Sequence, residues 1–166
     1  MTAQALDQFV FEGKAYALVE SEGGSLACPA NFGMKSAMTS TANRRGFSAT
    51  YVIAKEGLEL TAFGLRERDN CYLPINEIRP DLAEEGGYAT YTDVALPMSF
   101  TGTIRIAKDW DQANCSYITK TPAGESLRFR TVLDLAFREG EFMGLVHRSG
   151  GPGGTIGPLS DGCDIL

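Results

Sequence analysis

A stretch of alternating side chains near the end of the chain constrains the fold more than any other feature. In residues 127–138, apolar or small side chains occupy the odd positions, and most even positions are polar or charged. The odd set is Leu127, Phe129, Thr131, Leu133, Leu135 and Phe137, and the even set is Arg128, Arg130, Val132, Asp134, Ala136 and Arg138. Successive side chains of a β-strand point to opposite faces, so this period of two predicts a long strand with one buried face.

The same local device, two alternating segments around a Glu-Gly pair, occurs three times and predicts three hairpins. The pairs are Glu12-Gly13, Glu56-Gly57 and Glu139-Gly140. The expected partners are Phe9 opposite Tyr16, Ile53 opposite Leu60, Tyr51 opposite Ala62, and Phe142, Gly144 and Val146 opposite Phe137, Leu135 and Leu133. Glu is a poor first residue for a type I′ turn, so a longer loop with Gly in the left-handed conformation is the alternative to a two-residue turn.

Shorter segments between these hairpins also have strand character. They are residues 71–75, 88–91, 98–107 and 115–120, and residues 81–85 are compatible with a single helical turn. We therefore expect a mainly β fold of eight to ten strands with little helix. Many short antiparallel strands joined by turns favour a sandwich or a partly closed β-barrel, and the pattern does not choose between them.

The length and the glycine distribution indicate one domain followed by a tail. A chain of 166 residues can bury roughly 70% of its unfolded surface, so it needs no metal or disulfide to fold. Residues 1–149 form the expected β-rich domain, and residues 150–166 form a Gly/Pro-rich tail. The tail lacks the Lys-Ser/Thr ending of a phosphate-binding loop.

Charge and cysteine usage limit the partners and the location that we expect. The net charge of −6 argues against nucleic acid and suits a basic partner, or serves solubility alone. The first residues do not resemble a secretory signal, and no apolar run approaches the roughly 20 residues of a membrane span. The four dispersed cysteines fit a reduced, cytoplasmic protein without a metal site, and no cofactor is expected.

A polar stretch immediately before a predicted strand is the best candidate for a binding site. It contains Thr41, Asn43, Arg44 and Arg45, and loops at strand ends commonly carry binding groups. The two guanidinium groups could hold a carboxylate or phosphate in bidentate fashion. The alternative is that one arginine pairs with an acidic residue of the same domain and the other is solvated.

Two further constellations are candidates for chemistry. His147 is the only histidine and, in the predicted hairpin, stands opposite Val132 and diagonal to Asp134, so the two could act as an acid–base pair with a Cys or Ser nucleophile. The alternative is an ordinary surface histidine. Asp109 and Asp111 flank Trp110 and could hold a cation loosely, or they could be solvated beside a buried Trp.

Several segments together resemble an uncharacterised family of small bacterial proteins. The matching residues are Arg45-Gly46-Phe47-Ser48-Ala49-Thr50-Tyr51, Phe100-Thr101-Gly102 before a strand, and Asp134-Leu135-Ala136-Phe137 leading to Gly140. The likeness covers residues 8–149. The chain departs from the pattern at Asn43-Arg44, where the family has an aromatic residue before Arg45, and in its tail. The resemblance implies a bacterial origin and one domain, but brings no activity.

These observations favour a noncatalytic binding or protein-interaction domain, of which an acidic, antitoxin-like immunity protein is one form. The alternatives are a small-molecule carrier, whose aromatic residues would line a lipocalin-like pocket, and a small enzyme that uses His147.

Overall fold

The computed structural model describes residues 6–39, 43–54, 57–82, 88–110, 117–120 and 126–148, with the backbone alone given for residues 110, 117–120 and 126–128. The strands in this part of the chain are β1 (Gln8–Phe11), β2 (Lys14–Gly23), β3 (Phe47–Ala54), β4 (Gly57–Arg66), β5 (Asp81–Leu82), β6 (Tyr88–Tyr91), β7 (Leu96–Pro97), β8 (Gly102–Trp110), β9 (Tyr117–Lys120), β10 (Ser126–Arg138) and β11 (Glu141–His147). A short 3₁₀ helix, η1 (Pro29–Phe32), lies between β2 and β3 in the chain. The predicted mainly β fold is confirmed.

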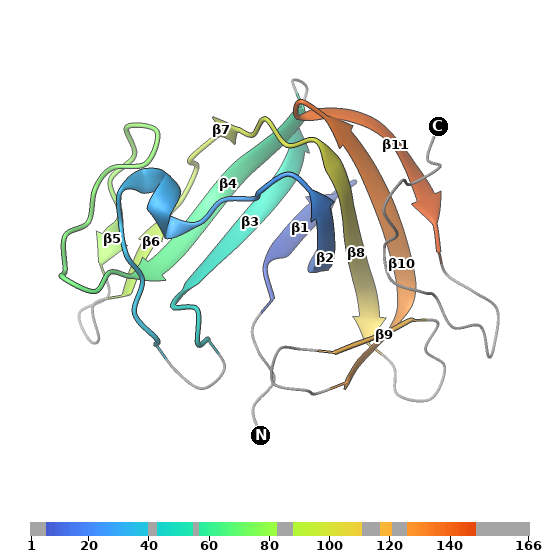
Figure 1. Ribbon diagram of the computed structural model, residues 1–166, viewed down its shortest axis with the longest axis horizontal. Coiled ribbons are helices and arrows are strands. Elements are labelled where there is room, and N and C mark those ends of the chain that lie inside the picture. The colour runs from blue at the N-terminus through green and yellow to red at the C-terminus, as the bar shows by residue number, and fades with distance from the viewer. Residues whose placement is uncertain are drawn as a thin grey trace.

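All of these strands belong to one curled sheet that is not closed into a barrel (Figure 1). Its main path runs β11-β10-β8-β2-β1-β3-β4-β6-β5, with β7 paired to β4 and β9 paired to β10. The sheet is mixed rather than wholly antiparallel, because β1 runs parallel to β3. Within the described residues, no helix is long and apolar enough to cross a membrane.

The first hairpin has the predicted register, with Phe9 opposite Tyr16. Its turn consists of two residues with positive φ, Glu12 at 50° and Gly13 at 75°. The third hairpin turns in the same way at Glu139 (49°) and Gly140 (85°). Both are two-residue turns of the I′ kind, so the longer loop considered for Glu-Gly is not used.

The predicted register of the second hairpin is wrong by two residues. Ile53 pairs with Leu58 and Tyr51 with Leu60, because Gly57 is the first residue of β4 rather than part of the turn. Gly57 has a φ of +119°, and a Cβ there would lie 2.2 Å from the carbonyl oxygen of Gly140. A close approach of two distant backbones therefore requires this glycine.

The third hairpin keeps its predicted register only next to the turn, where Phe137 faces Phe142. An irregularity between Ala136 and Phe137 then shifts β11, so that Leu135 faces Leu145 rather than Gly144. One extra residue in one strand of a pair moves each later side chain of that strand to the opposite face of the sheet.

Some shorter elements also differ from the predictions. Residues 71–75 form no strand, although Ile75 makes an isolated bridge to Ile78. Asp81 and Leu82 are a short strand rather than the start of a helical turn. Of the third expected segment, residues 98–101 form no strand, and β8 begins at Gly102 and extends to Trp110. The fourth is described only from Tyr117. The tail lies outside the described residues.

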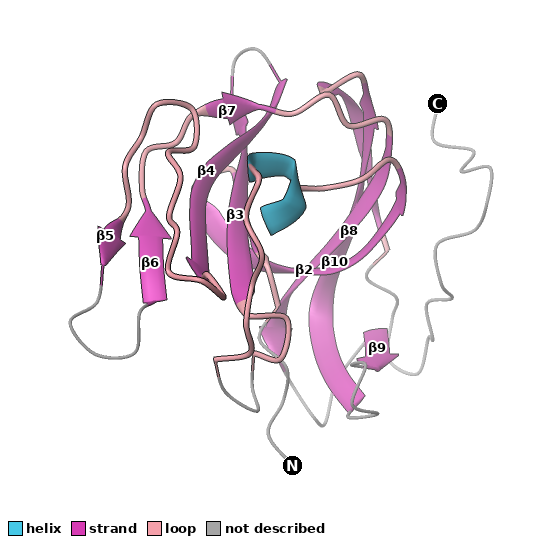
Figure 2. Cartoon of the chain, turned by 60° about the vertical axis from the view of Figure 1, so that its left-hand side comes forward, coloured by secondary structure: helices cyan, strands magenta, loops and turns pink. Residues whose placement is uncertain are grey.

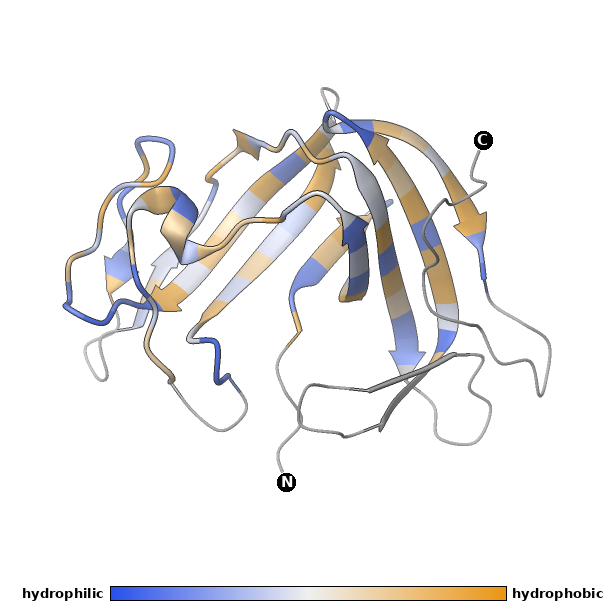
Figure 3. Cartoon of the chain, viewed as in Figure 1, coloured by the Kyte–Doolittle hydropathy of each residue, from blue (hydrophilic) through white to orange (hydrophobic). Residues whose placement is uncertain are grey.

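Aromatic and aliphatic side chains fill the curve of the sheet. The largest fully buried side chains include Phe9, Tyr51, Phe63, Tyr91 and Phe100. Figure 3 shows the underlying alternation of hydrophobic and hydrophilic residues along the strands. In Figure 2, η1 lies within the curve, and the Phe32 ring that it carries is 5.3 Å from that of Phe63. These aromatic residues belong to one packed core cluster.

Candidate anion-binding site

Three short segments are joined by backbone hydrogen bonds at the end of the sheet where β3 begins and β4 ends. The amide of Ala37 donates to the carbonyl of Arg66 (2.8 Å), and that of Arg66 donates to Gly46 (3.0 Å). The amide of Arg68 donates to the carbonyl of Lys35 (2.8 Å). Residues 35–37, 43–46 and 66–68 therefore lie side by side, although they are distant in sequence.

The turn before β3 depends on Asn43 and Gly46. The Asn43 Oδ1 accepts a hydrogen bond from the Gly46 amide (3.1 Å), which is a common way for Asn to stabilise a turn. Gly46 has a φ of +76°, and a Cβ there would lie 2.1 Å from the carbonyl oxygen of Ala37. Asn43 therefore has a structural role, whereas the sequence placed it among the ligand-binding residues. Thr41 lies outside the described residues.

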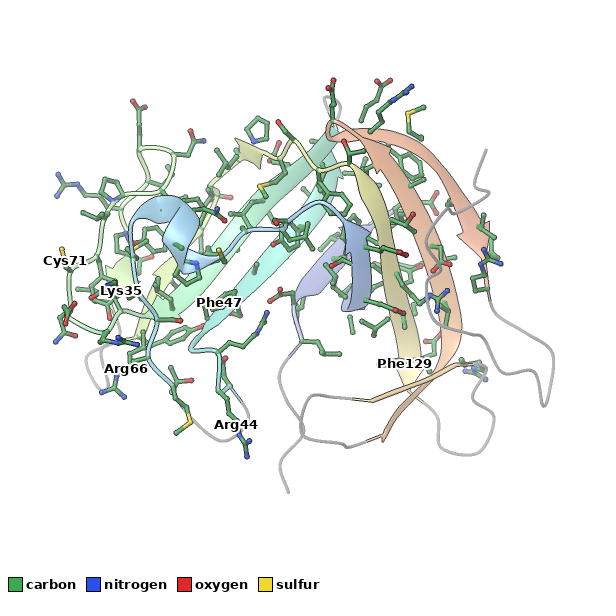
Figure 4. The ribbon with its side chains drawn as sticks, in the orientation of Figure 1. Lys35, Arg44, Phe47, Arg66, Cys71 and Phe129 are labelled. Carbon is green, nitrogen blue, oxygen red and sulfur yellow. The ribbon has the colours of Figure 1, made fainter. Side chains whose placement is uncertain are left out.

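This arrangement gathers five exposed cations into one basic patch, composed of Lys35, Arg44, Arg45, Arg66 and Arg68. Figure 4 shows Lys35, Arg44 and Arg66 at this end of the sheet. The whole chain has 15 basic and 21 acidic residues, so a third of its basic residues lie in this patch. The local charge is thus opposite to that of the protein as a whole.

Arg45 is held by an internal ion pair. This is the alternative to ligand binding expected from the sequence, in which one arginine pairs with an acidic residue of the same domain. Its Nη2 lies 2.7 Å from Asp7 Oδ1, and its Nη1 donates to Oδ2 at 3.4 Å. Its guanidinium carbon also lies 4.4 Å from the centroid of the Phe47 ring. Asp7 is nearly buried and accepts a further hydrogen bond from the Ala49 amide (2.9 Å). Arg45 is therefore engaged on one side, although its side chain remains 44% exposed.

The acidic residue between Arg66 and Arg68 is also engaged internally. Glu67 is 5% exposed, and its carboxylate accepts hydrogen bonds from the amides of Asp69 (2.6 Å), Cys71 (2.8 Å) and Lys35 (3.4 Å). The Cys71 amide above all holds the pKa of Glu67 below its ordinary value, against the effect of burial. Glu67 is therefore an ionised anchor for the loop that follows β4.

Three members of the basic patch make no ion pair with any carboxylate in the described part of the chain: Lys35, Arg66 and Arg68. Counting Asp7, Glu67 and the exposed Asp69 against the five cations leaves a positive balance. Asp7 is engaged by Arg45 and the Ala49 amide, and Glu67 by backbone amides, with the charge of Arg68 contributing nearby. The patch can therefore attract a carboxylate or phosphate from outside the chain.

The structure does not bring His147 and Asp134 together. His147 is exposed and stands opposite Leu133 rather than Val132, so the two side chains are on different faces of the sheet. Asp134 is fully buried and binds Arg105 through two hydrogen bonds (2.6 and 2.8 Å) and Arg148 through one (3.1 Å). The Nη1 of Arg105 also lies 3.6 Å from Glu20.

The structure describes only some of the remaining candidate residues, which are the two aspartates beside Trp110 and the four cysteines. Asp109 accepts a hydrogen bond from the hydroxyl of Thr131 (2.7 Å), while Asp111 lies outside the described residues. Cys28 and Cys71 are free thiols, and the remaining two cysteines are not described. Among the described residues, no group of three or more His, Cys, Asp or Glu side chains is arranged to hold a metal ion.

Sequence reasoning found only the Arg44-Arg45 part of the patch. Lys35, Arg66 and Arg68 come from other segments, and only the pairing of those segments brings them together. The one local signal was Arg66-Glu67-Arg68, in which the two arginines share one side of an extended chain.

No family model, no curated protein and no solved structure matches the chain.

Proposed function

We propose that this protein is a noncatalytic binding domain, and that its basic patch binds an anionic ligand carrying carboxylate or phosphate groups. The observation that carries the proposal is the group formed by Lys35, Arg66 and Arg68. These cations are exposed, make no ion pair with the described carboxylates, and stand on backbone segments that hydrogen bonds hold together.

The local architecture supports binding because it reduces the entropy that a ligand must overcome. Glu67 fixes the loop after Arg66 through three backbone amides, and Asp7 fixes Arg45. A site whose backbone is already ordered loses less conformational freedom on binding. Arginine also offers a planar fork of donors that matches carboxylate and phosphate oxygens.

The neighbouring polar groups support binding rather than reaction. The hydroxyl of Ser36 donates a 2.6 Å hydrogen bond to the carbonyl of Arg45, so it is not directed at a base. Activation of a nucleophile requires such a base within hydrogen-bonding distance. A noncatalytic role is therefore our proposal for this site.

A protein-interaction role, including that of an immunity protein, is the second candidate. It is favoured by the separation of charge, because the residues outside the basic patch are more acidic than the net charge of −6 suggests. A cytoplasmic location belongs to the same proposal and rests on the dispersed cysteines.

The test is thermal unfolding of the protein with tripolyphosphate or citrate at constant ionic strength. A bound ligand at about 100 times its dissociation constant stabilises the folded state by roughly 2.7 kcal/mol. For a domain of this size that corresponds to a rise in Tm of roughly 5–10 °C. Inclusion of both anions distinguishes phosphate from carboxylate ligands.

The decisive variant is the double substitution Arg66→Ala and Arg68→Ala, which should remove most of this rise. The matched control is Lys14→Ala with Arg138→Ala, which also removes two exposed cations but from the hairpin ends. The control should respond as the wild type does. An equal response in both double variants, or no response of the wild type to either anion, would refute the proposal.

A further inference from the structure

The outer face of the sheet beside the basic patch carries a tyrosine and an arginine on neighbouring strands. Arg66 of β4 stands directly opposite Tyr88 of β6, and the next pair is Leu65 opposite Ala89. Leu65 and Ala89 are fully buried in the core. Successive side chains of a strand point to opposite faces, so Arg66 and Tyr88 lie on the face away from the core, as does Gly64. Figure 1 shows β3, β4 and β6 side by side in this half of the sheet.

The ring of Tyr88 runs along this outer face rather than away from it. Its hydroxyl lies 3.0 Å from the hydroxyl of Ser48 in β3, and β4 lies between β3 and β6. The ring therefore spans β4, and it does so at Gly64, where a Cβ would lie 2.5 Å from the phenol oxygen. Gly64 makes room for the ring. Because Tyr88 is only half-buried, part of the ring is accessible to a ligand.

Three cations of the basic patch lie on the same outer face. Arg68 shares this face with Arg66, because the buried Glu67 between them points to the other one. Ser36 forms a bridge with Glu67, so Lys35 stands beside Arg68 on the face of the two arginines. The amide of Arg68 donates to the carbonyl of Lys35 (2.8 Å), which fixes this pairing. The three cations therefore continue from the edge of the tyrosine ring.

The spacing along β4 separates the aromatic surface from the cations. The ring lies over Gly64, Arg66 follows two residues later, roughly 7 Å along the strand, and Arg68 lies beyond it. Asp81 of β5 stands opposite Thr90 on the same face, so a carboxylate lies on the side of the ring away from the arginines. This charge disfavours an anionic group at the ring. The arrangement fits a ligand in which a spacer joins a planar ring to an anionic group.

We infer that the ligand of the basic patch is a nucleoside phosphate, whose base stacks on Tyr88 and whose phosphate binds Arg66, Arg68 and Lys35. The inference rests on the proposed anion-binding function and names the class of its ligand. Every base has a π-face that can stack on an aromatic side chain, and arginine binds phosphate in bidentate fashion. The ribose supplies the spacer. The net charge of −6 opposes a longer polyanion, so the ligand is a mononucleotide rather than a nucleic acid.

AMP and ribose 5-phosphate are matched probes, because they share the ribose and the phosphate and only AMP has a base. Their affinities are measured by isothermal titration calorimetry at constant ionic strength. AMP should bind the wild type at least about fivefold more tightly, which is the smallest effect expected of one stacked base. Equal affinities, or no binding of AMP by a protein that tripolyphosphate stabilises, would overturn the inference and leave the anion-binding function intact.

Variants of Tyr88 test the stacking itself. Tyr88→Leu removes the ring and should abolish the preference for AMP over ribose 5-phosphate, while the response to tripolyphosphate remains. Tyr88→Phe keeps the ring and should keep the preference. Thr90→Ala, exposed on the same face of β6, is the matched control and should bind as the wild type does. The Arg66→Ala and Arg68→Ala double variant should lose most of its affinity for both probes.

A measurement on the wild type keeps the test independent of how the variants fold, since a tyrosine packed across a glycine also stabilises a sheet. The NMR signals of the Tyr88 ring protons should move upfield with AMP, because a stacked base shields them, but not with ribose 5-phosphate. Unmoved ring signals at saturating AMP, or an undiminished preference for AMP in folded Tyr88→Leu, would show that Tyr88 has a structural role only.

Discussion

The amide of Leu58 donates a 2.6 Å hydrogen bond to the carbonyl of Gly140, which joins the start of β4 to the turn between β10 and β11. The amide of Gly140 in turn donates to Phe100 (2.8 Å), and that of Met98 donates to Leu58 (2.9 Å). Three segments from distant parts of the chain therefore meet at one rim of the curled sheet. This contact holds the two halves of the sheet around the aromatic core.

The rim explains why Gly57 should tolerate no side chain. Its φ of +119° is unfavourable for other residues, and a Cβ would lie 2.2 Å from the Gly140 oxygen. We expect Gly57→Ala to reduce the free energy of unfolding by at least about 2 kcal/mol in urea denaturation. Gly13→Ala is the control, because its φ is also positive but nothing lies within 4 Å, and it should cost about 1 kcal/mol. Equal losses would mean that the rim contact contributes little.

The centre of the longest strand gives a test of the core. Leu135 is fully buried, so Leu135→Ala should reduce the free energy of unfolding by on the order of 2–5 kcal/mol. The side chain of Arg128, the opposite-face residue of the predicted strand, is not among those described. Arg138→Ala, exposed on the same strand, serves as the control and should cost less than about 1 kcal/mol. Urea unfolding of both variants decides whether the buried face has been assigned correctly.

Arg105 and Asp134 form a buried ion pair whose removal should be asymmetric. Arg105→Ala leaves the fully buried carboxylate of Asp134 with Arg148 alone, and should cost on the order of 3–5 kcal/mol. The double variant Arg105→Met and Asp134→Leu removes both charges at similar volume and should be closer to the wild type in stability. A double variant that is less stable than Arg105→Ala would show that the pair itself stabilises the sheet.

The stability of the domain should fall in acid partly because of Glu67. Its pKa in the folded state lies below the ordinary value of 4.5, chiefly because the Cys71 amide donates to the carboxylate. The contribution of Glu67 to the free energy of unfolding is therefore fully present above its unfolded-state pKa. It is lost as the pH falls through its lower folded-state pKa. Glu67→Gln should cost about 1–3 kcal/mol at pH 7 and make unfolding less dependent on pH below 5. Glu141→Gln, at an exposed site, should leave the pH profile of urea unfolding unchanged.

Local patterns were sufficient to predict the class of fold, the three hairpins and the buried face around Leu135. The predictions from local patterns were wrong where a contact between residues distant in the sequence determines the structure. Gly57 was assigned to a turn, although its reason is the approach of Gly140, and the irregularity in β11 moved His147 to the face opposite Asp134. The parallel pairing of β1 with β3 has no local signal either, because residues 21–46, which lead from the first hairpin to β3, show no clear period.

The candidate site likewise combines residues that local sequence reveals with residues that only contacts between distant segments bring together. A pair of adjacent arginines is visible in the sequence, but Lys35 and Arg66 reach the same patch only through backbone hydrogen bonds between separate segments. The internal partner of Arg45, Asp7, lies in a segment that no motif connects with residues 43–46.

The two adjacent arginines should therefore differ in their effect on stability. Arg45→Ala leaves the nearly buried Asp7 carboxylate with the Ala49 amide alone and exposes the Phe47 ring, so we expect a loss of about 1–3 kcal/mol. Arg44→Ala, at an exposed turn position, should change stability by less than about 0.5 kcal/mol. Arg45→Lys keeps the charge but not the two-point contact, and should recover only part of the loss. Urea unfolding of the three variants decides the matter: equal midpoints for Arg44→Ala and Arg45→Ala would show that the Asp7 ion pair does not hold the start of β3 in place.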